Sequence, residues 1–188
     1  LDLAAGSPDS TVRQAARALA GWDYRFTAES VGASVWAAFW ARWTERVARA
    51  RLPEELVPAS VTAVGALARR LLLGEDLGWF VDGDAAVEAR DAFASAVAWL
   101  RDLAGPEITG WQWGKLHHVT FEHPLGRRGL LGALFDLGPH PTSGGQTVRA
   151  TGYEGRGERP FVVVSGSTYR LLADLSAPDR AWATTTSG

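Results

Sequence analysis

Residues 36–43 read WAAFWARW, and this short stretch decides the fold of the first half of the chain. Its aromatic residues recur at intervals of three and four, and Val47 continues the series. An α-helix has 3.6 residues per turn, so this spacing places the rings on one face of a helix. The sequence predicts a helix that starts after Thr27, runs to about Arg51 and is stopped by Pro53. We expect four of its rings to be largely buried: Trp36, Phe39, Trp40 and Trp43.

Three further helices are predicted around this one. Capping side chains at 7–10 precede a helix over 11–20, and another helix covers 59–73 and ends at Gly74. A fourth covers 85–104, with its apolar residues on one face. Just before it, Asp82-Gly83-Asp84 hints at calcium, but no EF-hand ligand spacing follows. A turn that caps the fourth helix is the favoured interpretation.

Beyond residue 105 the chain changes from helical to strand-like composition. Residues 126–145 are rich in glycine and predict a long surface connection with at most one helical turn, near 130–134. We therefore expect an α+β fold, with a helical region over 1–105 and a strand-rich region over 106–188 in one structural unit. Short β-type runs bounded by Gly, Pro, Ser and Asp predict the strands, at 115–122, 147–153, 161–165 and 168–175.

Composition excludes several classes of protein. Of the 188 residues, 46% are apolar and 21% charged, which is typical of a globular chain. The net charge of −2 lacks the basic excess that phosphate binding needs, so a nucleic-acid partner is not expected. No apolar run approaches the roughly 20 residues of a membrane span. The chain has no cysteine, which removes disulfides, thiolate metal sites and cysteine nucleophiles.

The histidines are possible metal ligands. In an extended strand successive side chains alternate, so His117 and His123 share a face and His118 lies opposite. Six extended residues separate His117 from His123 by about 20 Å, which is too far for one metal ion. We predict no metal site that involves two or more histidines. These histidines are instead expected to be polar residues at the end of a strand or beside a partner element.

No complete active site can be assembled from the residues alone. Ser165 or Ser167, His117 and Asp174 could form a Ser-His-Asp arrangement on paper, but the Gly-x-Ser-x-Gly pattern does not occur. Trp111 and Trp113 could face a groove that stacks a sugar, although packing of strand against helix is favoured. The residues by themselves indicate only a globular α+β domain.

Four segments carry a more specific signal. Residues 111–125, WQWGKLHHVTFEHPL, match the pattern W-x-W-G-x-L-H-x-x-x-F-x-H-P-L. Three more segments resemble other strings of one and the same family, in that family's order: residues 22–30 (WDYRFTAES), 144–148 (GGQTV) and 165–175 (SGSTYRLLADL). Together these segments resemble the penicillin acylase (penicillin amidase) family over nearly the whole chain.

The resemblance implies an N-terminal-nucleophile hydrolase with two stacked sheets between layers of helices, an αββα sandwich. In that family a precursor cleaves itself to expose a serine, whose α-amine acts as base while its hydroxyl attacks an amide carbonyl. Backbone and Asn donors hold the oxyanion. The implied substrate is a penicillin, a related β-lactam or an N-acyl homoserine lactone. No cofactor is expected, and a periplasmic or secreted location is suggested.

The resemblance also places this chain in the C-terminal part of the large subunit. It begins at Leu1 rather than at a serine, so the family's nucleophile has no counterpart here and we expect no activity alone. The expected partner is the rest of the same precursor, the small subunit and the N-terminal part of the large one, with self-association possible. His117 and Asp174 are candidate supporting residues, although a turn acceptor before Ala177-Pro178 is favoured for Asp174. The alternative function is a stand-alone binding or structural module that reuses this domain.

Overall fold

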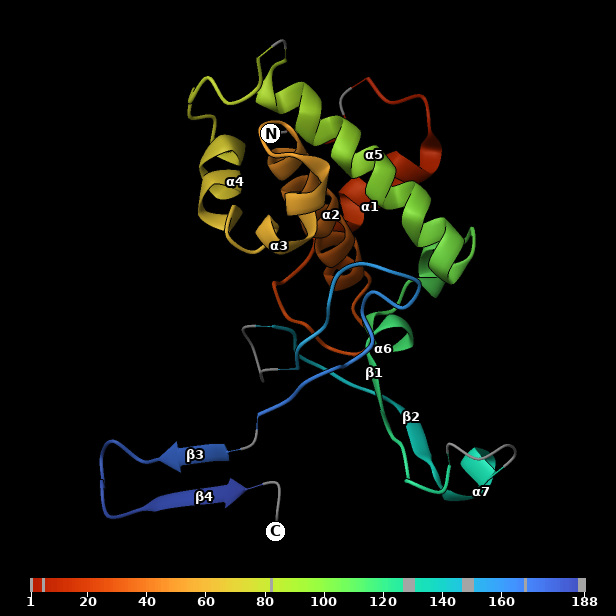
Figure 1. The fold of residues 1–188 in the computed structure, drawn as a ribbon, viewed down its shortest axis with the longest axis vertical. Coiled ribbons are helices and arrows are strands. Elements are labelled where there is room, and N and C mark those ends of the chain that lie inside the picture. Colours follow the sequence, from red (N-terminus) through yellow and green to blue (C-terminus); the bar gives the residue numbers. More distant parts are fainter. Residues whose placement is uncertain are drawn as a thin grey trace.

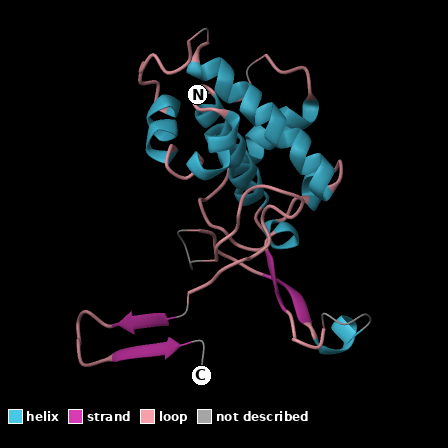
Figure 2. Cartoon of the chain, viewed as in Figure 1, coloured by secondary structure: helices cyan, strands magenta, loops and turns pink. Residues whose placement is uncertain are grey.

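The computed structural model of the chain describes residues 2–4, 6–81, 83–126, 131–146, 151–167 and 169–185. The helices within residues 10–104 gather at one end of the molecule, and the strands lie towards the other end together with the short helix of residues 132–135 (Figure 1). The cartoon coloured by secondary structure shows the same division, and the fold is mixed α+β, as predicted (Figure 2). Within the described residues, no helix combines the length and the apolar character that crossing a membrane requires.

The predicted aromatic helix is α2 (Val31–Arg49), and it forms the centre of the helical end. Its N-cap is Ser30, whose hydroxyl accepts a hydrogen bond from the backbone N–H of Ala33 at 3.1 Å. Phe39 and Trp43 are fully buried, which confirms the prediction for those two rings. Trp36 and Trp40 are only half-buried, because they lie towards the edge of the face that packs into the core.

Two other helices pack around α2 and match their predicted bounds closely. They are α1 (Ser10–Ala20) and α5 (Ala85–Ala104). Phe39 of α2 meets Phe93 of α5 edge to face, with ring centroids 5.7 Å apart. The N-cap of α1, Asp9, also accepts two hydrogen bonds of 2.8 Å from the guanidinium of Arg101 and so joins α1 to α5.

The single helix predicted over 59–73 is wrong. The structure has a 3₁₀ turn, η1 (Glu54–Leu56), followed by two short helices, α3 (Val57–Ser60) and α4 (Gly65–Leu72). The break contains β-branched residues, which lose rotamer freedom in a helix. Trp43 then fixes α4 on α2, because its indole N–H donates to the carbonyl of Ala68 at 3.0 Å. The chain turns at Gly74, as predicted, with φ +84°.

The strand predicted over 115–122 is correct only from residue 118. After a 3₁₀ turn, η2 (Ile108–Gly110), the chain forms the short helix α6 (Trp113–Leu116) and then β1 (His118–Phe121). Tertiary contacts override the strand pattern at α6. The N–H of Gly114 donates to the carbonyl of Ala28 at 2.7 Å, and a Cβ on this glycine would lie 2.8 Å from the Cβ of Ala28. Only glycine allows that approach.

The connection predicted over 126–145 contains a strand that the sequence did not indicate. The helical turn expected there is α7 (Gly132–Phe135), and it is followed by β2 (Leu137–Pro141). β2 pairs antiparallel with β1, with His118 opposite Pro141. Its two prolines argue against a strand, but a strand with one partner needs only part of its backbone donors.

A second antiparallel pair extends away from the rest of the molecule (Figure 1). β3 (Tyr169–Ala173) confirms the strand predicted over 168–175, whereas its partner β4 (Ala181–Thr185) was not predicted. Leu171 lies opposite Ala183 in this pair. We refer to residues 169–185 as the β3–β4 hairpin. The described residues thus contain two separate two-stranded sheets.

Two remaining strand predictions have different outcomes. The strand predicted over 161–165 is wrong, because this segment forms a turn and a single bridge between Ser165 and Gly152. The turn is favoured there because Phe161 is drawn into the core, where it is 1% exposed. Of the strand predicted over 147–153, residues 147–150 lie outside the described residues.

Candidate functional site

His117 lies at the junction of α6 and β1 and is completely buried. Its Nδ1 is 2.7 Å from the carbonyl oxygen of Phe161, and its Nε2 is 2.9 Å from Oγ1 of Thr151. A carbonyl oxygen can only accept, so Nδ1 carries the hydrogen and Nε2 of the neutral ring accepts from the Thr151 hydroxyl. His117 could act as a base only by giving up one of these bonds.

Aromatic rings surround this histidine. It stacks on Trp113 at 4.6 Å with an interplanar angle of 19°, and Tyr153 meets it edge to face at 5.6 Å. Burial lowers the pKa of His117; the bond to the Phe161 carbonyl opposes that shift, and the charge of His118 adds to it. Burial also raises the pKa of Tyr153 to about 12. This environment keeps both groups neutral at physiological pH.

Trp111 and Trp113 do not line a sugar-binding groove but are part of the core. Trp111 and Trp113 are both fully buried. Their indole N–H groups donate to the carbonyls of Gly105 and Gly144, each at 2.8 Å. The packing interpretation is therefore confirmed, although the partners come from a short helix and loops rather than from a strand against a helix.

Asp174 lies in the turn between β3 and β4. Its Oδ1 accepts from the backbone N–H and the hydroxyl of Ser176, at 2.9 and 2.6 Å. The hydroxyl and backbone hydrogen bonds from Ser176 hold its pKa below the usual value. This is the turn-acceptor geometry favoured from the sequence. The hairpin extends away from α6, so the structure does not bring Asp174 together with His117 (Figure 1).

The structure does not assemble the Ser-His-Asp arrangement that Ser165 or Ser167, His117 and Asp174 could have formed. The Nε2 of His117 faces Thr151, and Ser167 accepts from Arg170 at 3.1 Å. Across the described ranges, no three His, Cys, Asp or Glu side chains converge as a metal site would require. Thr151 and the Phe161 carbonyl, the two partners of His117, had no signal in the sequence, because each is brought in by a loop.

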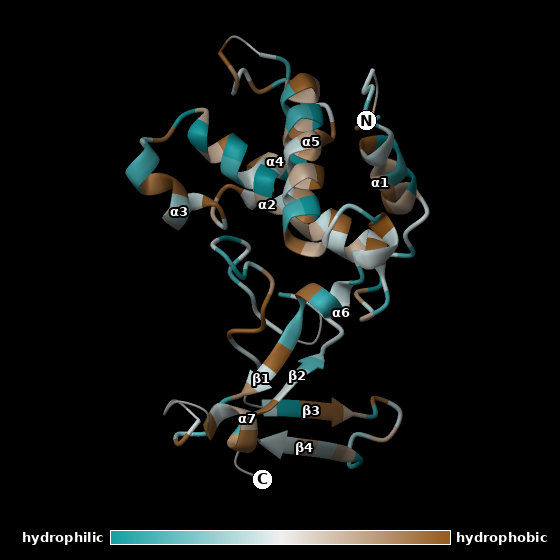
Figure 3. Cartoon of the chain, turned by 90° about the vertical axis from the view of Figure 1, so that its right-hand side faces the viewer, coloured by the Kyte–Doolittle hydropathy of each residue, from teal (hydrophilic) through white to brown (hydrophobic). Residues whose placement is uncertain are grey.

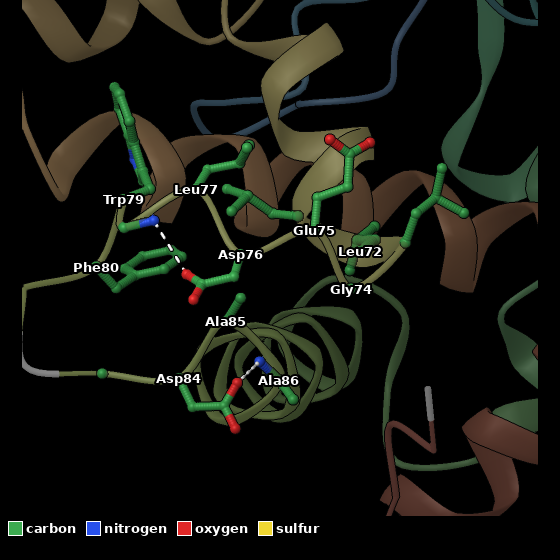
Figure 4. A pocket seen from close by; sticks show the side chains of 14 residues that line it. Leu72, Gly74, Glu75, Asp76, Leu77, Trp79, Phe80, Asp84, Ala85 and Ala86 are labelled. Atoms are coloured by element: carbon green, nitrogen blue, oxygen red, sulfur yellow. Dashed lines mark hydrogen bonds between the residues drawn. The ribbon is translucent and has the colours of Figure 1, made fainter.

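A hollow of about 530 Å³ lies between the end of α4 and the start of α5 (Figure 4). Three acidic residues line it. Glu75 pairs with Arg70, whereas Asp76 accepts the backbone N–H of Gly78 at 3.2 Å and Asp84 that of Ala86 at 2.8 Å. Asp84 is thus the N-cap of α5, as predicted. Asp82, the other acid of the supposed calcium motif, lies outside the described residues.

A smaller cavity, about 240 Å³, lies where α2, α3 and residues 153–157 meet. Trp40 and Arg42 of α2, Pro58 of α3 and Tyr153 are among its lining residues. In the sequence Arg42 stands between Trp40 and Trp43, and this position beside aromatic rings is the feature that could have indicated a site residue. This cavity, unlike the hollow beside α4, is built from segments that are distant in the chain.

These features describe an α+β protein with a tightly bonded core histidine and without an assembled triad among its described residues. The sequence profile of one family, penicillin amidase, matches the chain over residues 1–188. The chain belongs to the penicillin amidase family, which is a family of hydrolases. No curated protein matches it.

Proposed function

We propose that this chain is part of a penicillin-amidase-type hydrolase of linear amides and does not hydrolyse amides alone. The observation that carries the proposal is the family match along all 188 residues. The bonding of His117 supports the second half of it. Both of its ring nitrogens already have partners, so within the described residues it does not stand ready to activate a serine.

The nucleophile comes from the rest of the same precursor, the small subunit and the N-terminal part of the large subunit. The β3–β4 hairpin supports such a partner, because all the residues of its two strands are exposed. Strands of a stable sheet need further strands or a packed face. In the complete protein these strands contribute to the stacked sheets of the αββα sandwich, and His117 and Asp174 support the site only through the fold.

The substrate is an acylated amine, namely a penicillin, a related β-lactam or an N-acyl homoserine lactone. In the reaction the serine hydroxyl attacks the amide carbonyl and the amine leaves. Water then releases the acyl group as a carboxylic acid. Donors aimed at the oxyanion lower the barrier of both steps.

Turnover assays test this proposal. We expect the purified chain to hydrolyse neither penicillin G, nor a chromogenic phenylacetyl amide, nor an acyl homoserine lactone, because losing the nucleophile alone removes several orders of magnitude in rate. Saturable hydrolysis by the chain, abolished by His117→Ala or Asp174→Ala, would contradict it. In the complete enzyme the same two variants measure how far each residue supports catalysis.

A stand-alone binding module is the second candidate, and the cavity beside α2 is the observation that favours it. The two functions differ in what the gene encodes upstream of Leu1. An in-frame Gly-Ser self-cleavage junction there supports the hydrolase, and a gene without one supports the module.

A further inference from the structure

The cavity of about 240 Å³ beside α2, which we name the α2–α3 cavity, has the make-up of a small-molecule site. Apolar side chains from two segments form much of its wall: Trp40 from α2, and Val57 and Pro58 from α3. Ligand sites combine such walls with a few convergent polar groups. Its volume is below the roughly 300–1,000 Å³ of sites for drug-sized molecules, so the ligand is small.

Arg42 supplies a fixed positive charge to the cavity. Its guanidinium carbon lies 4.0 Å from the ring centroid of Trp99, and its Nη1 donates to Glu45 at 3.1 Å. Its Nε–H is shielded from solvent and has no partner among the described residues, and its Nη2 bonds to none of them. One carboxylate therefore satisfies only part of this five-donor group.

Two further donors line the same cavity. The hydroxyl of Tyr153 makes no hydrogen bond to another described residue. Because the pKa of Tyr153 is raised to about 12, this hydroxyl keeps its proton and can donate it. Arg156 donates to the carbonyl of Pro58 and forms no ion pair with a described residue.

The acidic residues of the cavity are mostly engaged already. Arg49 binds Glu54 at 2.8 Å and Glu45 at 3.0 Å, and Glu45 also receives Arg42. Glu154 is the lining carboxylate that has no ion pair within the described residues, and it is exposed to solvent. Among the ionisable lining residues, Arg42 keeps an unpartnered N–H and Arg156 has no ion pair with a described residue, against the single carboxylate of Glu154, which favours a ligand that brings acceptors.

We propose that the α2–α3 cavity binds a small carboxylic acid with an apolar body. The carboxylate receives hydrogen bonds from Arg42, Arg156 and the Tyr153 hydroxyl. The apolar body packs against Trp40 and the α3 wall. The site is independent of amide hydrolysis, so this proposal does not rest on the proposed function.

Three probes of one shape and different charge test the ligand class by isothermal titration calorimetry on the 188-residue chain. They are benzoate, neutral benzamide and cationic benzamidine. We expect benzoate to bind saturably at one site, benzamide to bind more weakly and benzamidine not to saturate. Failure of benzoate to saturate would overturn the proposal. Benzamidine binding as tightly as benzoate would overturn it too, because Glu154 would then be the recognising group.

Two variants locate the bound acid. Tyr153→Phe removes only a hydroxyl without a bond to the described residues, so the fold is retained, and we expect it to weaken benzoate binding about tenfold. Arg42→Gln should weaken it at least as much. The matched control is Arg46→Gln one turn along α2, where Arg46 pairs with Glu88 and Asp91 outside this cavity. Unchanged affinity in Tyr153→Phe, or an equal loss in Arg46→Gln, would contradict the proposed site.

Discussion

The helical body, α1 to α5, and the β3–β4 hairpin differ in how far their large apolar side chains are exposed to solvent. In the body, Phe39, Trp43 and Phe93 are at most 1% exposed. In the hairpin, Leu172 is 72% and Trp182 65% exposed. The hydropathy colouring shows apolar residues in the second half of β3 (Figure 3), and every residue of this strand is exposed. Both regions are rich in apolar residues, but only the body has covered them.

This difference indicates which part of the chain is stable without further packing partners. A two-stranded hairpin without a packed face is only marginally stable in water, whereas a close-packed core of aromatic rings is stable. The hairpin carries Tyr169 and Leu171 on one face and Leu172 and Trp182 on the other. Covering it therefore takes a layer on each face, as in the αββα sandwich proposed for the complete protein.

Truncating one tryptophan in each region should give the largest contrast. Trp43→Ala removes a fully buried ring and its bond to Ala68, so we expect the free energy of unfolding to fall by about 3–5 kcal/mol. Trp40→Ala should cost less, because Trp40 is only half-buried. Trp182→Ala, in the hairpin, should stay within about 0.5 kcal/mol. Urea unfolding followed by circular dichroism measures all three, and a similar loss for Trp43→Ala and Trp182→Ala would break the comparison.

An effect of similar size is expected at His117, which joins α6 to the loops at 151 and 161. His117→Phe keeps a ring beside Trp113 but leaves the Phe161 carbonyl and the Thr151 hydroxyl without their partner. Each buried group left unpaired costs about 1–3 kcal/mol. His140→Phe is the matched control, because His140 is exposed on β2 and should change stability little.

The same residue makes stability depend on pH. The pKa of His117 is lowered in the folded chain, so below the ordinary value of 6.5 the unfolded chain binds more protons than the folded one. Stability contributed by the neutral ring is present above pH 6.5 and falls as the pH drops below it. Unfolding curves between pH 7.5 and pH 5 should show this loss in the wild type and a smaller one in His117→Phe. Equal pH dependence in the two proteins would show that another group is responsible.

Apart from the segment 59–73, the helical half was predictable because its signals are local. The spacing of rings in α2, the caps at Asp9, Ser30 and Asp84, and the stop at Gly74 all act within a few residues. Prediction failed where distant contacts decide. α6 replaces a strand because Gly114 packs against Ala28, and β2 forms despite its prolines because β1 lies beside it.

The candidate site follows the same rule. His117 was picked out from its motif, but its bonds depend on Thr151 and Phe161, which loops bring from more than thirty positions away. Asp174 was interpreted correctly as a turn acceptor because its partner, Ser176, is two residues away. The proposed roles of both residues in catalysis stay predictions.

The smallest expected effect concerns association. Among the described strands, β3 and β4 pair only with each other, and their apolar side chains are exposed; such surfaces pair with other copies. We expect light scattering to show an apparent mass that rises with concentration. The double variant Leu172→Ser, Trp182→Ser should reduce that rise without lowering the stability of the helical body. A clean monomer at high concentration would show that the hairpin does not self-associate.

The central claim is that the helical body is stable by itself and that the hairpin becomes stable only when other chain segments pack against it. Amide hydrogen exchange, resolved by residue, tests this claim most directly. In the isolated chain we predict slow exchange for the amides of α2 and α5 and fast exchange for those of β3 and β4. In the complete precursor proposed above, the hairpin amides should become as protected as those of α2. Hairpin amides that are already as protected as those of α2 in the isolated chain, or that stay unprotected in the precursor, would contradict the account.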